Sequence, residues 1–294
     1  MSSAWGEIGQ RLRAYRLGKG FTAADMAERI GVSRAALYRL EKGELVKIET
    51  LEKVAELLDV SMPSLLGVGV EYYRNAVAFF ERMRQLEEGA LQILGNFTPI
   101  SFLLLSDEYV GHLRTMLLES IEANSPDRTR FADYVDRVLG VLSERRQTAD
   151  KRQPPVVSIV TTRTVEHFLR AGLIGRYDLD AKVAKQRRVL ARREVERLVD
   201  ILRRQPIGTQ IGVVEDFAVE QTFEVFEKSD KTFVAMSPYR LGAHPNISSG
   251  VAMVTSAPEA VRMFKDIIME QWERASKGER GAQMLEDLLK RTPL

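Results

Sequence analysis

The segment around residue 36 carries the side chains best suited to recognition chemistry. Leu37 and Leu40 recur at helical spacing, which predicts a short helix with both leucines turned toward a core. The opposite face of that helix then presents four residues: Arg34, Ala35, Tyr38 and Arg39. An arginine on such a face can bond a guanine through two nitrogens, while a small apolar group or an aromatic ring can contact a thymine methyl. The pattern therefore predicts a helix that reads base edges in the major groove of double-stranded DNA.

A second set of residues near this helix has the chemistry of phosphate contacts. Thr22 and Ser33 each precede a predicted helix and are typical N-caps. Their hydroxyls, and the first backbone N–H groups of the two helices, are expected to face phosphates. Lys42 and Lys47 follow the reading helix and add positive charge. Contacts of this kind fix the register of a protein on the duplex without reading its sequence.

Short helices are expected around this segment to hold it in place. Residues 5–66 contain five compact helical patterns separated by Gly, Ser or Pro. Gly31 stands between the second and third patterns, where a left-handed residue would end one helix and let the next begin at an angle. We therefore expect an all-α domain over residues 1–67. A plain bundle with a solvated arginine face is the simpler alternative, but it does not account for the order of cap, turn and reading face.

Residues 8–66 resemble the Cro/repressor-type, or XRE-type, helix-turn-helix family, whose DNA-binding domain is a lambda-repressor-like bundle of five helices. Four segments carry the resemblance: residues 8–13, 20–27, 30–43 and 51–58. The resemblance implies a DNA-binding transcriptional regulator of the repressor type. The family commonly has a glutamine after the residue that matches Thr22, where it contacts DNA, and this sequence has Ala23 there. We therefore expect Arg34, Arg39 and backbone amides to carry more of the contact.

Composition narrows the class of protein. The 294 residues, 45% of them hydrophobic, suffice for two domains that each bury a core. The absence of cysteine excludes disulfides, thiolate metal sites and cysteine nucleophiles, and it fits a reducing cytoplasm. No apolar run approaches the roughly 18 residues of a membrane helix, and the N-terminus lacks the order of a signal peptide. We expect a cytoplasmic protein with no membrane partner.

The charge balance determines how tightly one module can hold DNA. Residues 1–66 contain ten Lys or Arg and nine Asp or Glu, so their attraction to phosphates is modest. Two copies would double the contacts, which predicts a homodimer on a roughly palindromic operator. Residues 68–96 hold apolar residues spaced three or four apart. We interpret them as one connecting helix that either forms a dimer seam or packs on its own C-terminal domain.

Residues 97–294 alternate helical patterns with apolar segments of strand length. Helices are expected near residues 107–122, 130–145, 180–204 and 259–275, and strands at residues 156–162, 208–214, 222–226, 231–235 and 250–255. This mixture indicates an α/β or α+β domain. Its order of motifs resembles an uncharacterised domain that often follows this helix-turn-helix in bacterial regulators, which implies a response to a signal. We interpret it as a regulatory domain that senses a small molecule or mediates dimerisation.

Candidate catalytic residues are few. None of the three histidines, His112, His167 and His244, has a second His or a carboxylate at the spacing of a helical metal motif. None is followed two residues later by lysine, as phospholipase D-type enzymes would require. The sequence also lacks a nucleophile elbow, a phosphate-binding loop and a dinucleotide glycine pattern. We expect no enzyme, no catalytic residue, no cofactor and no metal. The alternative is a nucleotide or phosphodiester hydrolase fused to a DNA-binding domain.

Two further features each have two interpretations. His244 lies in a polar, turn-rich loop at residues 242–250, which either closes over a small-molecule ligand or simply connects two strands. The cation-rich stretch at residues 182–204 either contacts phosphates or is the solvated face of a helix whose Leu198 and Leu202 point inward. We favour the connecting loop and the solvated face, and we keep His244 as a candidate for ligand binding.

Overall fold

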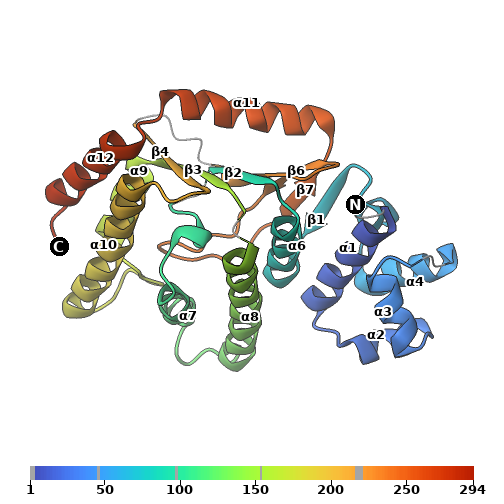
Figure 1. The fold of residues 1–294 in the computed structure, drawn as a ribbon. Coiled ribbons are helices and arrows are strands. Elements are labelled where there is room, and N and C mark those ends of the chain that lie inside the picture. The colour runs from blue at the N-terminus through green and yellow to red at the C-terminus, as the bar shows by residue number, and fades with distance from the viewer. Residues whose placement is uncertain (1–3, 45–46, 97–98, 153, 216–220) are drawn as a thin grey trace.

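An N-terminal helical module is followed by a larger domain built on a mixed sheet (Figure 1). The computed structural model describes residues 4–44, 47–96, 99–152, 154–215 and 221–294. The helices of the module are α1 (Ala4–Lys19), α2 (Ala23–Ile30), α3 (Arg34–Glu41), α4 (Ile48–Leu58) and α5 (Met62–Leu66). Its core is made of buried apolar side chains, among them Leu12, Met26, Leu37 and Val54. The predicted five-helix module is confirmed.

Within the described residues, a seven-stranded sheet organises the C-terminal domain. Its strands are β1 (Val70–Tyr73), β2 (Gln92–Asn96), β3 (Val156–Thr161), β4 (Thr209–Val214), β5 (Phe223–Glu227), β6 (Thr232–Met236) and β7 (Ala252–Thr255). The order across the sheet is β1-β7-β6-β5-β2-β3-β4. β2, β3 and β4 run parallel, and the other pairs are antiparallel. The predicted α/β class and the predicted hairpin of β5 and β6 are confirmed.

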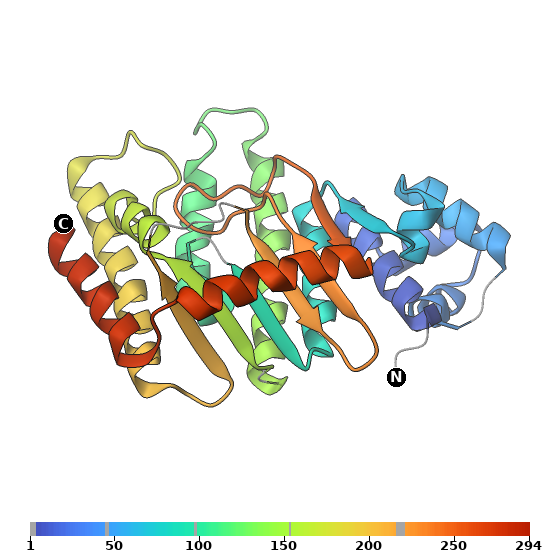
Figure 2. The same cartoon turned by 90° about the horizontal axis from the view of Figure 1, so that it is seen from above.

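Helices cover both faces of this sheet. The helices of the domain are α6 (Ala76–Glu88), α7 (Tyr109–Glu119), α8 (Arg128–Arg152), α9 (Thr162–Ala171), α10 (Ala181–Arg204), α11 (Pro258–Arg274) and α12 (Gly278–Arg291), with a 3-10 turn η1 (Phe102–Leu104). α11 runs diagonally across one face, and α6, α7, α8 and α10 lie on the other (Figures 1 and 2). All six residues of β3 are buried, as expected for a parallel strand covered on both sides. α9 and α12 were not predicted.

The prediction of one connecting helix over residues 68–96 is wrong. Residues 70–73 form β1 at one edge of the sheet, where they pair with β7, and residues 92–96 form β2 between β5 and β3. Only the stretch Ala76–Glu88 is helical. Apolar residues spaced three or four apart predict one helix, whereas pairing with distant strands decides the conformation at both ends of the segment.

α6 offers no surface for the predicted dimer seam. Every residue from Ala76 to Met83 is buried, because α6 lies against both α1 and α8. The other interpretation was that this helix packs on its own C-terminal domain. The contact between α6 and α8 confirms it. Residues 68–96 therefore belong structurally to the sheet domain. The predicted boundary at residue 97 falls on residues 97–98, which lie outside the described residues.

The module packs closely on the C-terminal domain through α1. A Cβ atom at Gly18 of α1 would lie 2.6 Å from the Cβ atom of Ala78 in α6, closer than two carbon atoms can approach. Tyr15 stacks on Tyr73 of β1 with ring centroids 4.8 Å apart. Buried side chains of the module and of the domain form one continuous cluster. The position of the module is thus set by packing as well as by the chain connection.

Candidate nucleic-acid interface

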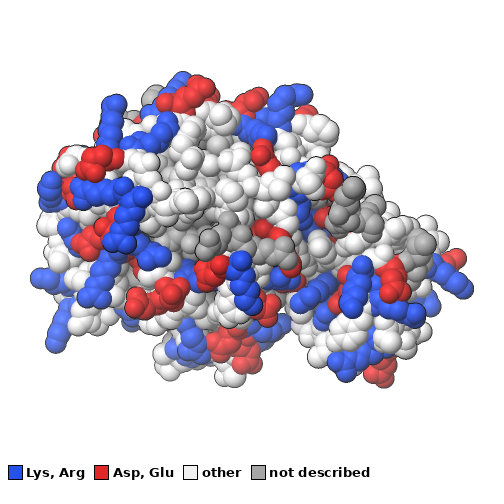
Figure 3. Space-filling model, viewed as in Figure 1, with Lys and Arg blue, Asp and Glu red and all other residues white. Residues whose placement is uncertain are grey.

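α3 turns its predicted reading face toward solvent. The Ser33 hydroxyl accepts a hydrogen bond from the Ala36 N–H at 3.1 Å, so Ser33 caps α3 as predicted. Leu37 and Leu40 are buried. The four predicted contact residues are exposed: Arg34, Ala35, Tyr38 and Arg39. The structure brings them together on one open face, and their contact with bases stays a prediction. Lys and Arg side chains, interspersed with acidic ones, lie on the visible surface of the module (Figure 3).

The start and the end of α2 fix its angle to α3. Thr22 and Asp25 form a capping box: Thr22 Oγ1 accepts from the Asp25 N–H, and Asp25 Oδ2 accepts from the Thr22 N–H, both at 3.1 Å. Hydrogen bonds from Thr22 lower the pKa of Asp25, so this carboxylate is ionised. Gly31 has a φ of 72° and its N–H donates to two carbonyl groups of the last turn. The predicted cap and turn are therefore present.

Arg34 and Arg39 have weak partners on the surface of α3. Arg34 Nη2 donates to Tyr38 Oη at 3.1 Å, and its guanidinium carbon lies 5.4 Å from the centroid of the tyrosine ring. Because the two residues are one helical turn apart, this contact holds the guanidinium along the open face. Arg39 lies 3.7 Å from Glu44, and both side chains are more than half exposed. An exposed pair of this kind is weak and is screened by salt, so both arginines can exchange these partners for DNA.

A buried ion pair fastens α3 to α1. Arg16 Nε donates to Glu41 Oε1 at 2.6 Å, and both side chains are less than a tenth exposed. Arg16 also donates to the carbonyl oxygen of Phe21 at 2.8 Å. Gly9 allows the close approach, since a Cβ atom there would lie 2.4 Å from the carbonyl oxygen of Glu41. This pair cannot be predicted from local sequence, because its members are 25 residues apart and each resembles an ordinary surface charge.

Lys42 and Lys47 border the C-terminal end of α3. Lys42 is the C-cap of α3, and Lys47 stands at the N-cap of α4 without a side-chain hydrogen bond to the helix. Both side chains are exposed. The N–H groups that begin α4 lie beside Lys47, so positive charge and backbone donors occur together there. Both lysines stay predicted phosphate contacts.

A buried charge network joins α1 to the sheet domain. Arg82 of α6 is fully buried and donates to Glu71 of β1 at 3.0 Å and to Glu7 of α1 at 2.9 Å. Arg11 lies 3.4 Å from both of these carboxylates, and Tyr73 Oη donates to Glu71 at 2.6 Å. Burial raises the pKa of Tyr73, which keeps its hydroxyl protonated as a donor. Lys228 Nζ lies 3.9 Å from Glu7 as well, so two guanidinium groups and one ammonium group surround the two carboxylates, and the network fixes α1 against the sheet.

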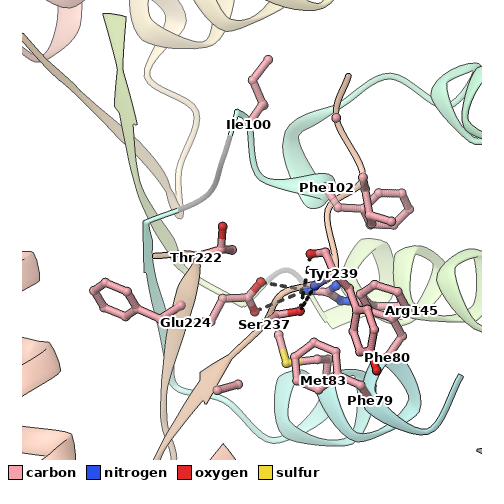
Figure 4. Close-up of a pocket in the computed structure, with 14 residues that line it drawn as sticks. Phe79, Phe80, Met83, Ile100, Phe102, Arg145, Thr222, Glu224, Ser237 and Tyr239 are labelled. Atoms are coloured by element: carbon pink, nitrogen blue, oxygen red, sulfur yellow. Dashed lines mark hydrogen bonds and ion pairs between the residues drawn. The ribbon is translucent and has the colours of Figure 1, made fainter. Parts of the chain in front are cut away.

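A cavity of about 50 Å³ lies between α6, α8 and the sheet (Figure 4). Its apolar wall includes Phe79, Phe80, Met83, Ile100 and Phe102. Arg145 of α8 reaches into it and lies 3.2 Å from Glu224 of β5. The same guanidinium donates from Nε to Glu87 of α6 at 2.8 Å. Its lining, apolar with a few convergent polar groups, resembles that of a small-molecule site, but sites of that kind usually enclose roughly 300–1,000 Å³, so this cavity must widen to hold more than a few atoms.

Two carboxylates share the single guanidinium of Arg145. Burial raises the pKa of Glu224 to about 8, because the attraction of Arg145 does not offset desolvation and Glu87 repels a second charge. Burial raises the pKa of Glu87 as well. Desolvation opposes the charge of Arg145, but the two carboxylates together raise its pKa. Near neutral pH the pair of carboxylates therefore holds a proton, which it can donate in a hydrogen bond.

The histidines form no metal site in the part of the chain that the structure describes. No group of three His, Asp or Glu side chains is arranged there to hold a metal ion. His244 has a φ of 51°, and its ring lies 3.8 Å from the ring of Tyr177. Burial lowers the pKa of His244, and its Nε2 atom has no described partner. It does not line the cavity around Arg145, so its role in ligand binding stays a prediction.

The cations of α10 only partly form a solvated face. Leu198 and Leu202 are buried as predicted, and Arg193 is exposed. Arg192, however, donates to carbonyl oxygens at the end of α12 at 2.7 and 2.8 Å, and Arg197 donates to the carbonyl oxygen of a residue in η1 at 3.0 Å. These arginines therefore join α10 to neighbouring elements. None of the described helices is long and apolar enough to cross a membrane.

Comparisons with known proteins concern mainly the N-terminal module. A family model described as helix-turn-helix matches residues 12–65. The HTH-type transcriptional regulator SinR of Bacillus licheniformis is 41% identical over 62 residues, which are 20% of this chain and 56% of that protein. SinR of Bacillus subtilis (strain 168) is 41% identical over 61 residues, 20% of this chain and 55% of its own. The chain thus spans about half the length of the curated relatives it matches.

One solved structure aligns with most of the chain. It is that of TrmBL2, an archaeal chromatin protein, and the alignment covers 91% of this chain and 93% of that one at 14% identity. The TM-score of 0.32 is too low to support an argument about fold or function. The comparisons therefore bear on residues 12–65 and leave the sheet domain to be interpreted from its own geometry.

Proposed function

We propose that the chain is a sequence-specific, DNA-binding transcriptional regulator, because the helix-turn-helix family model matches residues 12–65 and the same region is similar to HTH-type transcriptional regulators. The open face of α3 carries the proposal, because Arg34 and Arg39 are exposed above the buried Leu37 and Leu40. A helix presented in this way enters the major groove and leaves phosphate contacts to the flanking helix starts. Double-stranded DNA is the proposed partner, and the cytoplasm is the proposed location.

Selection from a pool of random duplexes tests this function. The full chain is mixed with the pool in excess competitor DNA, and the bound duplexes are sequenced over several rounds. We expect a preferred sequence to be enriched, since bidentate arginine contacts discriminate among base pairs. A pool that stays random after selection would contradict the proposal.

We further propose that the chain binds as a homodimer on a roughly palindromic operator. The near balance of charges in residues 1–66 gives one module a modest attraction to phosphates, and a second copy doubles the contacts. The selected sequence should then contain two inverted half-sites about one helical turn, roughly 34 Å, apart. Sedimentation of the complex should give two chains per duplex, and one chain on a single half-site would contradict the dimer.

We also propose that the C-terminal domain senses a small molecule in the cavity around Arg145. The support is that α6 and α8, which form its walls, connect it to α1: α6 contacts both α8 and α1. A domain used purely for assembly would not need an ionic cluster facing a cavity. Operator affinity measured across a broad metabolite set should change with at least one compound, and Glu224→Gln should blunt that response. Unchanged affinity with every compound would count against sensing.

Finally, we propose that the chain is not an enzyme. The alternative, a nucleotide or phosphodiester hydrolase fused to a DNA-binding domain, would need an acid and a base that converge on substrate. Glu87 and Glu224 are the two carboxylates that could best act as such an acid and base, but both accept hydrogen bonds from Arg145. Purified protein should show no hydrolysis of nucleotides or phosphodiesters. Turnover that disappears in Glu224→Gln would favour the enzyme instead.

A further inference from the structure

Helix α8 of the C-terminal domain brings an exposed arginine to the turn before α2. Gly20 lies in this turn with a φ of 75°, and a Cβ atom built on it would lie 2.6 Å from Nη1 of Arg137. The guanidinium of Arg137 therefore rests against the backbone two residues before Thr22, the N-cap of α2. Arg137 is exposed to solvent. A cation from the sheet domain thus stands beside a helix start that the proposed function places near DNA.

Arg137 is held in position without being neutralised. Its guanidinium carbon lies 5.6 Å from the centroid of the Tyr134 ring, and Tyr134 is itself anchored by a hydrogen bond from Oη to the carbonyl oxygen of Ile247 at 3.0 Å. Asp136, the preceding residue, pairs with Arg114 at 2.8 Å. Among the described carboxylates, none forms an ion pair with Arg137. A positioned cation without a counter-charge keeps its attraction for an external anion.

A cation beside the start of α2 favours the binding of a phosphate there. The ionised carboxylate of Asp25 lies at this end of the helix and repels a phosphate that approaches the first N–H groups. Lys19, at the end of α1, lies 3.6 Å from Asp59 and is partly compensated by it. Arg29 of α2 acts on Asp25 from within the module, and Arg137 of α8 adds a further positive charge beside Gly20, in the turn that precedes α2. The sheet domain therefore adds positive charge next to the start of α2.

We infer that Arg137 binds a backbone phosphate of the operator, so that the C-terminal domain forms part of the DNA-binding surface. The inference rests on the proposed function and adds to it a contact from outside residues 12–65. The phosphate bound is one adjacent to the start of α2. Because backbone contacts carry no sequence information, Arg137 strengthens binding to operator and to random DNA alike. Its contribution also depends on the position of α8 relative to α1.

Fluorescence anisotropy of labelled duplexes with the full-length chain, at a series of salt concentrations, tests this contact. Arg137→Ala should weaken binding roughly fivefold per protomer at 0.15 M salt, and should lower the slope of log affinity against log salt by about 0.9 per protomer. Arg137→Lys should retain most of the affinity, since it keeps the charge. Arg262→Ala removes another exposed arginine, from α11 on the opposite face of the sheet, and it should change neither quantity.

The possible results distinguish failure of the Arg137 contact from failure of the proposed DNA-binding function. If the wild type binds a selected operator but Arg137→Ala matches Arg262→Ala in affinity and salt slope, the Arg137 contact is overturned while the proposed function stands. If Arg137→Ala weakens binding to operator but not to random duplex, the contact is with a base and the phosphate assignment is overturned. If the wild type binds no duplex above competitor, both fail. Equal thermal unfolding midpoints of the variants show that losses do not arise from misfolding.

Discussion

On α3, Arg34 and Arg39 stand in solvent beside neighbours that hold them weakly, whereas Arg82, where the module meets the sheet, is fully buried and shares Glu7 and Glu71. All three carry the same charge. The exposed pair can exchange its present partners for a ligand, because little energy is lost when surface contacts break. The buried arginine cannot, because an uncompensated charge would be left in the interior. The exposed arginines are therefore the proposed DNA contacts, and the buried arginine fixes the position of the module that presents them.

Removal of the buried arginine should give the largest effect on stability. Arg82→Ala should lower the free energy of unfolding by about 3–5 kcal/mol, since Glu7 and Glu71 lose a shared partner in the interior. The matched control is Arg203→Ala: Arg203 is 38% exposed and also contacts two carboxylates. That variant should change stability by about 0–1 kcal/mol. Urea unfolding measures the stability of both variants. Similar losses in the two would contradict the difference between buried and exposed arginines.

The buried cluster around Arg145 should make the free energy of unfolding depend on pH. The pKa of Glu224 rises from 4.5 to about 8 on folding. Between these values the folded chain holds a proton that the unfolded chain has released, so stability falls as the pH rises through this window. From pH 6 to pH 8 the fall attributable to Glu224 should reach roughly 2–3 kcal/mol. Glu224→Gln should flatten it, and parallel curves for wild type and variant would refute the assignment.

Truncation of the exposed arginines should affect DNA binding and leave folding almost unchanged. Arg34→Ala and Arg39→Ala should each weaken operator binding by roughly 1–3 kcal/mol if they read bases. Unfolding should be affected by less than about 0.5 kcal/mol, as for other surface changes. Anisotropy titrations on operator and on random duplex provide the measurement. Equal losses on both duplexes would make these residues phosphate contacts and not base readers.

The smallest expected effect concerns the cap of α3. Ser33→Ala removes the hydroxyl that accepts from the Ala36 N–H and should cost about 1 kcal/mol of stability. Ser33→Asn keeps a side-chain acceptor and serves as the control, with stability close to that of the wild type. Thermal unfolding resolves the two. If Ser33→Asn is as unstable as Ser33→Ala, the loss does not arise from the missing cap.

Local signals made the module predictable from sequence. The caps at Thr22 and Ser33 and the turn at Gly31 act within a few residues, and the structure contains all three. β1 and β2 were missed because their conformations depend on pairing with distant strands: Tyr73 pairs with Ala252. The periodicity of residues 70–93 could not reveal such partners.

A charged residue inside an apolar run is a sequence signal for a buried ion pair. Arg82 lies between buried residues of α6, and a charge at such a position implies a buried partner. The identity of the partner could not be inferred, because Glu7 is 75 residues away in sequence. The same holds for Arg145, whose partner Glu224 is 79 residues away. The sequence therefore predicted the exposed face of α3 better than the buried ion pairs that hold the module in place.

Methylation protection of guanine N7 atoms on the selected operator tests most directly whether α3 reads the major groove. N7 lies on the major-groove edge of guanine and is an acceptor for arginine. We predict that the wild type protects specific guanines in each half-site, and that Arg34→Ala or Arg39→Ala exposes the guanine that its arginine covers. A fully bound operator whose guanines all react as in free DNA would contradict the account.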